Sequence, residues 1–167
     1  PARILDTRSG LGQGAAGAVG PDQTIDVQVS GRGGVPATGA SAVVLNVTAV
    51  SPTAGGYLTV YPTGAARPTI SNVNFAAGAV VPNMATVVLG SGGQLSVYNP
   101  AGSTHVLFDV VGYYADATGP SGARFTSVEP FRRFDTRNNW GFVGTEPIGP
   151  GGTLSVNVFT AGSPVPS

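Results

Sequence analysis

The feature that most constrains this chain is a segment that occurs twice. The octapeptide PARILDTR at residues 1–8 returns as PFRRFDTR at residues 130–137, an offset of 129 residues. Continued without a gap, the same offset aligns residues 19–29 with residues 148–158, and 11 of the 29 aligned positions are identical. The chain of 167 residues is therefore one repeat of 129 residues followed by the first 38 residues of a second.

Composition and charge exclude several classes of partner. Charged residues make up 10% of the chain, and eight arginines balance eight carboxylates, so the formal net charge is zero. Proteins that bind nucleic acids or anionic membranes usually carry a basic excess, so neither partner is predicted. No apolar run reaches the ~18 residues of a membrane span, so membrane insertion is not expected.

The apolar runs are short, rich in β-branched residues and bounded by Gly, Pro, Asn and Ser, which predicts strands and turns rather than helices. The expected strands are residues 24–29, 42–50, 57–61, 69–75, 85–89, 94–98 and 104–114. Strand 57–61 is predicted to return against 42–50. Strands 85–89 and 94–98 are predicted to form a tight hairpin around a glycine-rich turn, and residues 76–83 a loop.

About eight strands at roughly ten-residue spacing predict an all-β fold, an antiparallel β-sandwich of the jelly-roll type. A β-trefoil is the alternative, because hairpin signals recur at roughly forty-residue intervals. The predicted organisation is a complete sandwich at residues 1–115, a linker at 116–123 and a partial second repeat at 124–167. The Gly, Pro and Ser of the linker favour a hinge.

Several longer motifs stand out along the chain, at residues 1–8, 33–39, 42–50, 55–62, 103–107 and 109–114, from PARILDTR to DVVGYY. Together they resemble the tandem extracellular repeats of secreted and cell-surface proteins from actinobacteria and other environmental bacteria. The resemblance implies an extracellular or cell-surface location and modules in a row, with no defined activity. The second copy departs from the pattern at Phe131, Arg133 and Phe134, which replace small and aliphatic residues.

The sharpest constellation of charges is the Asp-Thr-Arg motif and its surroundings. Asp109 lies in an apolar run and is expected to be buried and ionised. A buried charge is costly without a partner, so Arg3 or Arg8 is expected to pair with it. The second copy of the motif is expected to behave in the same way. The predicted structural ion-pair residues are Arg3, Asp6, Arg8, Asp109, Asp135 and Arg137. A site for a polar ligand at the motif is the alternative.

Catalysis and metal binding find little support in the residues. His105 is the only histidine, and on a strand it lies about 13 Å from Asp109, beyond the reach that a triad with Ser103 requires. Zinc binding is not predicted, because the chain has no cysteine and only one histidine. No regular calcium loop is present, although an irregular site at Asp22 or Asp116 stays open. The chain is therefore predicted to be non-enzymatic, without cofactor or metal.

Aromatic residues raise a further hypothesis, carbohydrate contact, because a flat ring can cover the apolar face of a pyranose. The candidates are Trp140, the only tryptophan, together with Tyr57 and Tyr61, which share one face of their strand. Trp140 aligns with Leu11 in the first copy, so a stacking role is not shared by the two copies. Packing in the core or at its rim is the alternative for the two tyrosines.

The leading prediction for function is an extracellular structural module that assembles head to tail into a fibre or surface layer. Segment 153–158 duplicates a strand whose place is already filled, and an orphan strand exposes an edge and an apolar face. The predicted assembly strand, with Thr153, Leu154, Val156 and Val158, would then join the sheet of another subunit, so the partner is a second copy. The alternative is a carbohydrate-binding or cell-wall adhesion module from a longer tandem array, with polysaccharide as its partner.

Overall fold

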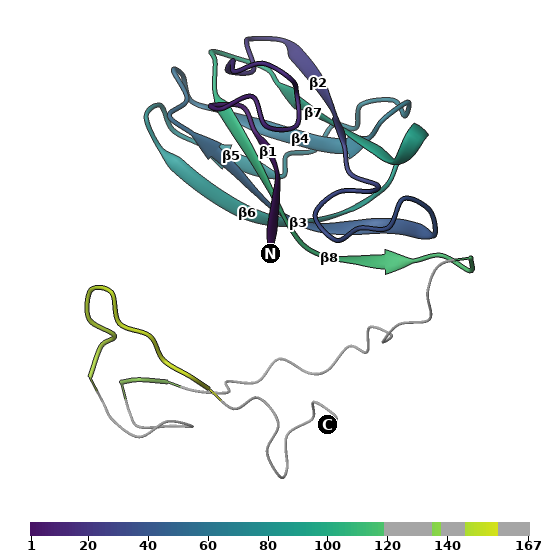
Figure 1. Cartoon of the computed structure of the whole chain (residues 1–167). Helices are drawn as coiled ribbons and strands as arrows, with labels where there is room; N and C mark the ends of the chain where they lie inside the picture. The colour runs from purple at the N-terminus through teal and green to yellow at the C-terminus, as the bar shows by residue number, and fades with distance from the viewer. Residues whose placement is uncertain (119–134, 138–145, 157–167) are drawn as a thin grey trace. The chain divides into compact units, whose positions relative to one another are not determined.

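The computed structural model describes residues 1–118, 135–137 and 146–156, and within these ranges all eight strands lie before residue 116. The chain divides into two compact units, residues 1–122 and 123–167, and the strands belong to the first (Figure 1). The strands are β1 (Ala2–Asp6), β2 (Gln23–Gln28), β3 (Ala40–Val50), β4 (Gly56–Pro62), β5 (Val73–Phe75), β6 (Val80–Val88), β7 (Gln94–Asn99) and β8 (His105–Ala115).

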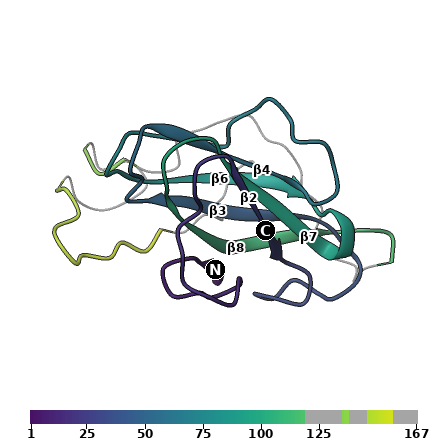
Figure 2. The same ribbon diagram turned by 90° about the horizontal axis from the view of Figure 1, so that it is seen from above.

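The eight strands form two antiparallel four-stranded sheets, one in the order β1-β8-β3-β6 and the other in the order β2-β7-β4-β5. This is the strand order of a jelly roll. Figure 1 shows β2, β7 and β4 in one layer above β6, β3 and β8, and Figure 2 shows the same layers from above. The predicted all-β sandwich is confirmed. The β-trefoil is wrong, because the strands form two stacked open sheets.

The two predicted hairpins are wrong, although their strands exist. β3 and β6 belong to one sheet, whereas β4 and β7 belong to the other, so both connections cross between the layers. The connection from β6 to β7 contains a short 3-10 turn at Ser91–Gly93. At its start Gly90 packs against the backbone of Thr63 so closely that a side chain would not fit. The apolar faces of β3 and β4, and those of β6 and β7, therefore meet across the core and not side by side in one sheet.

β6 begins earlier than the sequence indicates, inside the predicted loop 76–83. It includes Pro82, which would interrupt a strand in the middle of a sheet because proline has no N–H to donate. Among the described strands β6 pairs with β3 alone, so it is an edge strand of its sheet. Proline is tolerated on such an edge, and its position there explains why the strand was missed.

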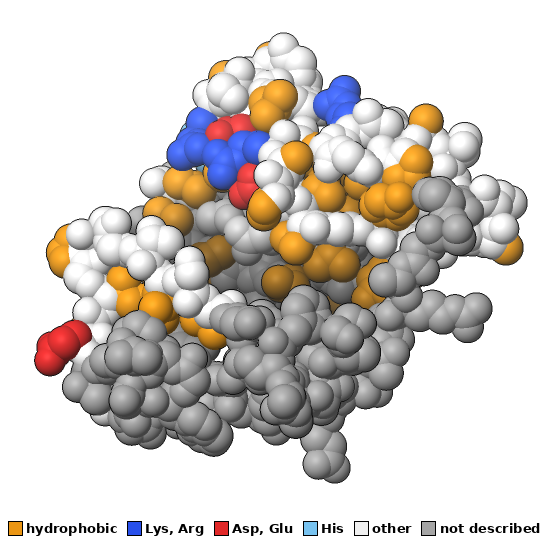
Figure 3. Space-filling model, turned by 60° about the horizontal axis from the view of Figure 1, so that its bottom comes forward, with side chains coloured by type: hydrophobic (Ala, Val, Ile, Leu, Met, Phe, Trp, Pro, Cys, Tyr) orange, Lys and Arg blue, Asp and Glu red, His pale blue; other side chains and the backbone are white. Residues whose placement is uncertain are grey.

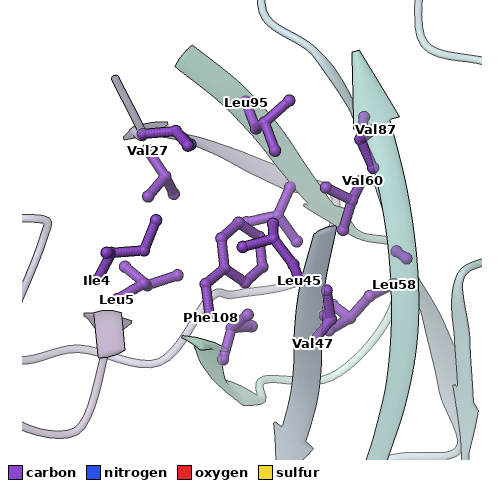
Figure 4. Packing of buried hydrophobic residues seen from close by; sticks show 14 of the residues in the cluster. Ile4, Leu5, Val27, Leu45, Val47, Leu58, Val60, Val87, Leu95 and Phe108 are labelled. Atoms are coloured by element: carbon purple, nitrogen blue, oxygen red, sulfur yellow. The ribbon is translucent and has the colours of Figure 1, made fainter. Parts of the chain in front are cut away.

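The core lies between the inner faces of the two sheets (Figure 4). The largest side chains that are fully buried are Phe108, Leu5, Leu45, Leu58 and Leu95. They come from five of the eight strands, and β2, β5 and β6 contribute Val27, Phe75 and Ala85 to the same core. Burying a side chain of this size contributes about 1.5–3 kcal/mol, which makes the inner residues the main source of stability.

Candidate functional site

The first Asp-Thr-Arg motif folds into a closed ring of hydrogen bonds, which we call the clasp. Asp6 is the last residue of β1. Its Oδ1 accepts hydrogen bonds from the backbone N–H of Arg8 at 3.0 Å and from Nε of Arg8 at 2.9 Å. Its Oδ2 accepts a third from Nη2 of Arg8 at 2.7 Å. These charge-assisted bonds hold the pKa of the Asp6 carboxyl well below its ordinary range.

A second ion pair joins β1 to β8. Arg3 donates from Nε to Oδ1 of Asp109 at 2.8 Å and from Nη2 to Oδ2 at 3.1 Å, a bidentate contact between residues that are paired in the sheet. Arg3 also reaches Oδ2 of Asp6 at 3.3 Å, which links this pair to the clasp. On the face drawn in Figure 3, arginine and aspartate side chains gather in one patch.

The partner of Asp109 is Arg3, while Arg8 is used within the clasp. The expectation that Asp109 is buried needs correction, because its side chain is 17% exposed and that of Arg3 is 40% exposed. The pair lies on the outer face of the sheet and not in the core. Water therefore screens this ion pair, and its contribution to stability is smaller than that of a fully buried pair.

Thr7, the middle residue of the motif, is the buried anchor that sequence reasoning missed. It is 0% exposed. Its Oγ1 accepts a hydrogen bond from the backbone N–H of Val106 at 2.9 Å and lies 3.0 Å from Nδ1 of His105. The only histidine of the chain is thus engaged with a threonine of the motif, with neither Ser103 nor Asp109 among its hydrogen-bond partners.

The second motif forms the same clasp as the first. Oδ1 of Asp135 accepts the backbone N–H of Arg137 at 3.0 Å and Nε at 2.9 Å, and Oδ2 accepts Nη2 at 2.6 Å. No distance differs by more than 0.1 Å from its counterpart in the first clasp. The buried fraction is also alike, since Asp6 is 7% and Asp135 is 8% exposed. The repeat in the sequence is therefore a repeat in local structure.

The Gly-Pro turn after each clasp repeats as well. In the second copy the N–H of Gly152 donates to the carbonyl of Gly149 at 2.9 Å. Gly151 has a φ of 72°, and its counterpart Asp22 has a φ of 53°, so both copies use the left-handed region at the same position. A non-glycine residue seldom adopts this conformation, so the agreement indicates the same turn in both copies.

The two copies differ in burial. Val19 is 1% exposed in the core of the sandwich, whereas its counterpart Ile148 is 53% exposed. Residues 153–156 align with β2 but belong to none of the eight strands. Thr153 is exposed, Leu154 and Val156 are half-buried, and Val158 lies outside the described residues. The predicted assembly strand thus keeps apolar side chains that are not fully buried.

The aromatic candidates separate clearly. Tyr57 is 37% exposed on β4, whereas Tyr61 on the same face is 8% exposed and lacks the open ring face that stacking on a sugar requires. Trp140 lies outside the described residues. Next to Tyr57, the guanidinium of Arg67 lies 3.6 Å above the ring centre of Tyr98, a contact that the sequence did not suggest.

The two aspartates considered for calcium have other contacts. Asp22 accepts a hydrogen bond from Tyr98 Oη at 2.8 Å, which raises the pKa of the tyrosine hydroxyl. Asp116 accepts hydrogen bonds from the backbone N–H and the hydroxyl of Thr118, both at 2.7 Å. In the described ranges no three acidic or histidine side chains are grouped closely enough to hold a metal. The same residues include no helix with the length and apolarity of a membrane span.

Comparison of the chain with models of protein families finds no match, and comparison with curated proteins finds none either.

Proposed function

We propose that the chain is a non-enzymatic, extracellular structural module that assembles head to tail, with the duplicated segment of one copy joining the sandwich of another. One observation carries this proposal: the second copy has the local structure of the first, yet its apolar residue Ile148 is 53% exposed where Val19 is 1% exposed. Exposed apolar surface is unfavourable in water and marks interaction sites. The resemblance to tandem extracellular repeats supports the location.

The geometry of the sandwich favours one of its four edges as the host. β5 is three residues long, too short to bind the six-residue segment 153–158. β1 is already bridged at Asp6 by Leu11 of its own loop. β2 directs the carboxylate of Asp26 to the outer face, next to the place of an added strand. β6 is nine residues long and, of the strands that the structure describes, pairs only with β3, which makes it the best template.

The hydrogen bonds at the ends of β6 show which of its residues face the open edge. The N–H of Leu89 donates to Ser41 and the N–H of Ser51 donates to the carbonyl of Ala79, each at 2.9 Å. Odd-numbered residues of β6 therefore bond to β3, and even-numbered residues direct their N–H and C=O groups outward. Pro82 is one of the outward residues and removes a donor, so the first half of the edge is blunted.

The second half of the β6 edge is open and apolar. Met84, Thr86 and Val88 carry the outward backbone groups, and Met84 and Val88 are 63% and 62% exposed. In the added segment Leu154 and Val156 alternate at the same two-residue period, so both can lie beside these side chains on the outer face. We therefore assign residues 84–88 of a neighbouring copy as the host of segment 153–158.

Sedimentation velocity over a range of concentrations tests this assembly with one variant on each side of the contact. Val156→Asp places a charge on the apolar face of the donated strand, and Ser155→Asp on the opposite face is the matched control. Thr86→Pro removes an outward N–H without removing a bond to β3, as Pro82 already does in the natural sequence.

We expect the natural chain and Ser155→Asp to form concentration-dependent linear oligomers, and Val156→Asp and Thr86→Pro to stay monomeric with unchanged melting temperatures. Oligomers of the same size in all four proteins would show that strand addition at this edge is wrong. If only Val156→Asp lost assembly, segment 153–158 would still be the donated strand, but the host would be an edge other than β6.

A further inference from the structure

A groove lies on the outer face of the second sheet, whereas the first clasp lies at the end of β1 in the other sheet. It has a volume of about 370 Å³, within the range of about 300–1,000 Å³ typical of small-molecule sites. Tyr57 and Thr59 of β4 line one side, and Arg67, Ile70 and Ser71 of the loop between β4 and β5 line the other. Assembly through segment 153–158 makes no use of this groove.

The loop side of the groove is fixed to β4 by three hydrogen bonds. Thr59 Oγ1 donates to the carbonyl of Ile70 at 2.6 Å. The backbone N–H of Asn72 donates to the carbonyl of Leu58 at 2.8 Å, and its Oδ1 accepts the N–H of Val60 at 2.7 Å. These bonds hold the shape of the groove before any ligand binds, which lowers the entropic cost of binding.

Arg67 is held in place but keeps its donors for a ligand. Its guanidinium lies over the ring of Tyr98, 3.6 Å from the ring centre, a cation–π contact that restrains the side chain. The nearest carboxylate, Asp22, is 4.0 Å away and accepts its hydrogen bond from Tyr98 instead. Within the described residues no acceptor lies within hydrogen-bond distance of this guanidinium, and its side chain is 46% exposed.

We infer that this groove binds a saccharide unit that bears a carboxylate, such as a uronate residue of an acidic polysaccharide. The planar guanidinium of Arg67 matches a carboxylate in a two-bond contact, and the ring of Tyr57, 37% exposed, can cover the apolar face of the sugar. The hydroxyl of Ser71 adds a donor or acceptor for the sugar hydroxyls. The net charge of the chain is zero, so no general attraction of the chain to a polyanion is expected.

Affinity electrophoresis of the full chain through gels that contain polygalacturonate tests the site, with dextran as the neutral probe. Arg67→Met and Tyr57→Ala remove the two main contacts. Arg32→Met removes an exposed arginine from another loop, and Tyr114→Ala removes a tyrosine of β8 that is 39% exposed on the other sheet. Circular dichroism melts check that each variant is folded, and Arg67→Lys keeps the charge without the planar fork.

We expect polygalacturonate to retard the natural chain and both control variants, with at least tenfold weaker binding by Arg67→Met and Tyr57→Ala and an intermediate effect of Arg67→Lys. No retardation of the natural chain would overturn the site. Equal retardation by dextran and by polygalacturonate would overturn the role of the carboxylate. If Arg32→Met weakened binding as much as Arg67→Met does, the binding would be non-specific attraction to positive charge. None of these results depends on oligomer formation, which sedimentation measures separately.

Discussion

Thr7→Val is the sharpest perturbation of the Asp-Thr-Arg motif, because it keeps the shape of the side chain and removes only the hydroxyl. Thr7 is 0% exposed, so no water replaces the lost group. The backbone N–H of Val106, which now donates to Thr7 Oγ1 at 2.9 Å, would be left buried without an acceptor. The contact of 3.0 Å with Nδ1 of His105 would also be lost.

The expected cost follows from these two contacts. A buried donor without a partner costs about 1–3 kcal/mol, and the half-buried His105 can turn to water, so its share is smaller. We expect the free energy of unfolding to fall by about 1–3 kcal/mol. This is a large part of the total free energy of unfolding of a domain, which is roughly 5–15 kcal/mol. At about 4 °C per kcal/mol for a unit of this size, the melting temperature should fall by about 4–12 °C.

Urea unfolding measures this loss, with Thr136→Val as the matched variant in the second copy. Thr136 is half-buried, so its loss of a hydroxyl should change the stability by no more than about 0.5 kcal/mol. The midpoint should shift for Thr7→Val without a change in slope. An unchanged midpoint for Thr7→Val, or an equal shift for both variants, would refute the assignment of Thr7 as the anchor between β1 and β8.

Two further predictions concern the charges around the motif. Asp109→Ala should lower the free energy of unfolding by about 1–2 kcal/mol and not by the ~3–5 kcal/mol of a fully buried pair, because Arg3 is 40% exposed and can rehydrate. The control Asp116→Ala should change the free energy of unfolding by less than about 0.5 kcal/mol. Equal melting temperatures of the two variants would contradict this prediction. The hydrogen bonds from Arg8 depress the pKa of the Asp6 carboxyl, so its stabilisation is complete above the unfolded pKa of about 3.9 and is lost as the pH falls below that value. Urea unfolding repeated at decreasing pH measures this loss of stability. In Asp6→Asn the stability should depend less on pH in the acid range, and an unchanged dependence would show that Asp6 is not the cause of the loss.

The strands and the fold class could be predicted from the sequence because a two-residue alternation of apolar side chains is a local signal. Which strands pair with one another could not be predicted in this way, because pairing depends on contacts between distant parts of the chain. The glycine-rich connection at residues 90–93 suits a hairpin as well as a crossing between sheets, and only the packing of the core decides between them. Pro82 concealed the start of β6, because its missing N–H is harmless only on an edge that the sequence does not reveal.

The candidate site was predicted in part. Electrostatics indicated that an arginine near the motif pairs with Asp109, and the structure identifies Arg3. The role of Thr7 depends on a backbone N–H of β8 that lies 99 residues away in the chain, which no local pattern can show. Its return as Thr136 in the second copy was the one available signal. Arg67 gave no signal, because its contact with Tyr98 exists only after the loop folds over the sheet.

Electron microscopy of the purified chain tests the proposed head-to-tail assembly most directly. The account predicts linear particles that lengthen with protein concentration and that are absent from Val156→Asp, because the apolar face of segment 153–158 needs the edge of a neighbouring sandwich. Single particles of one size at every concentration, for the natural chain as for the variant, would contradict it.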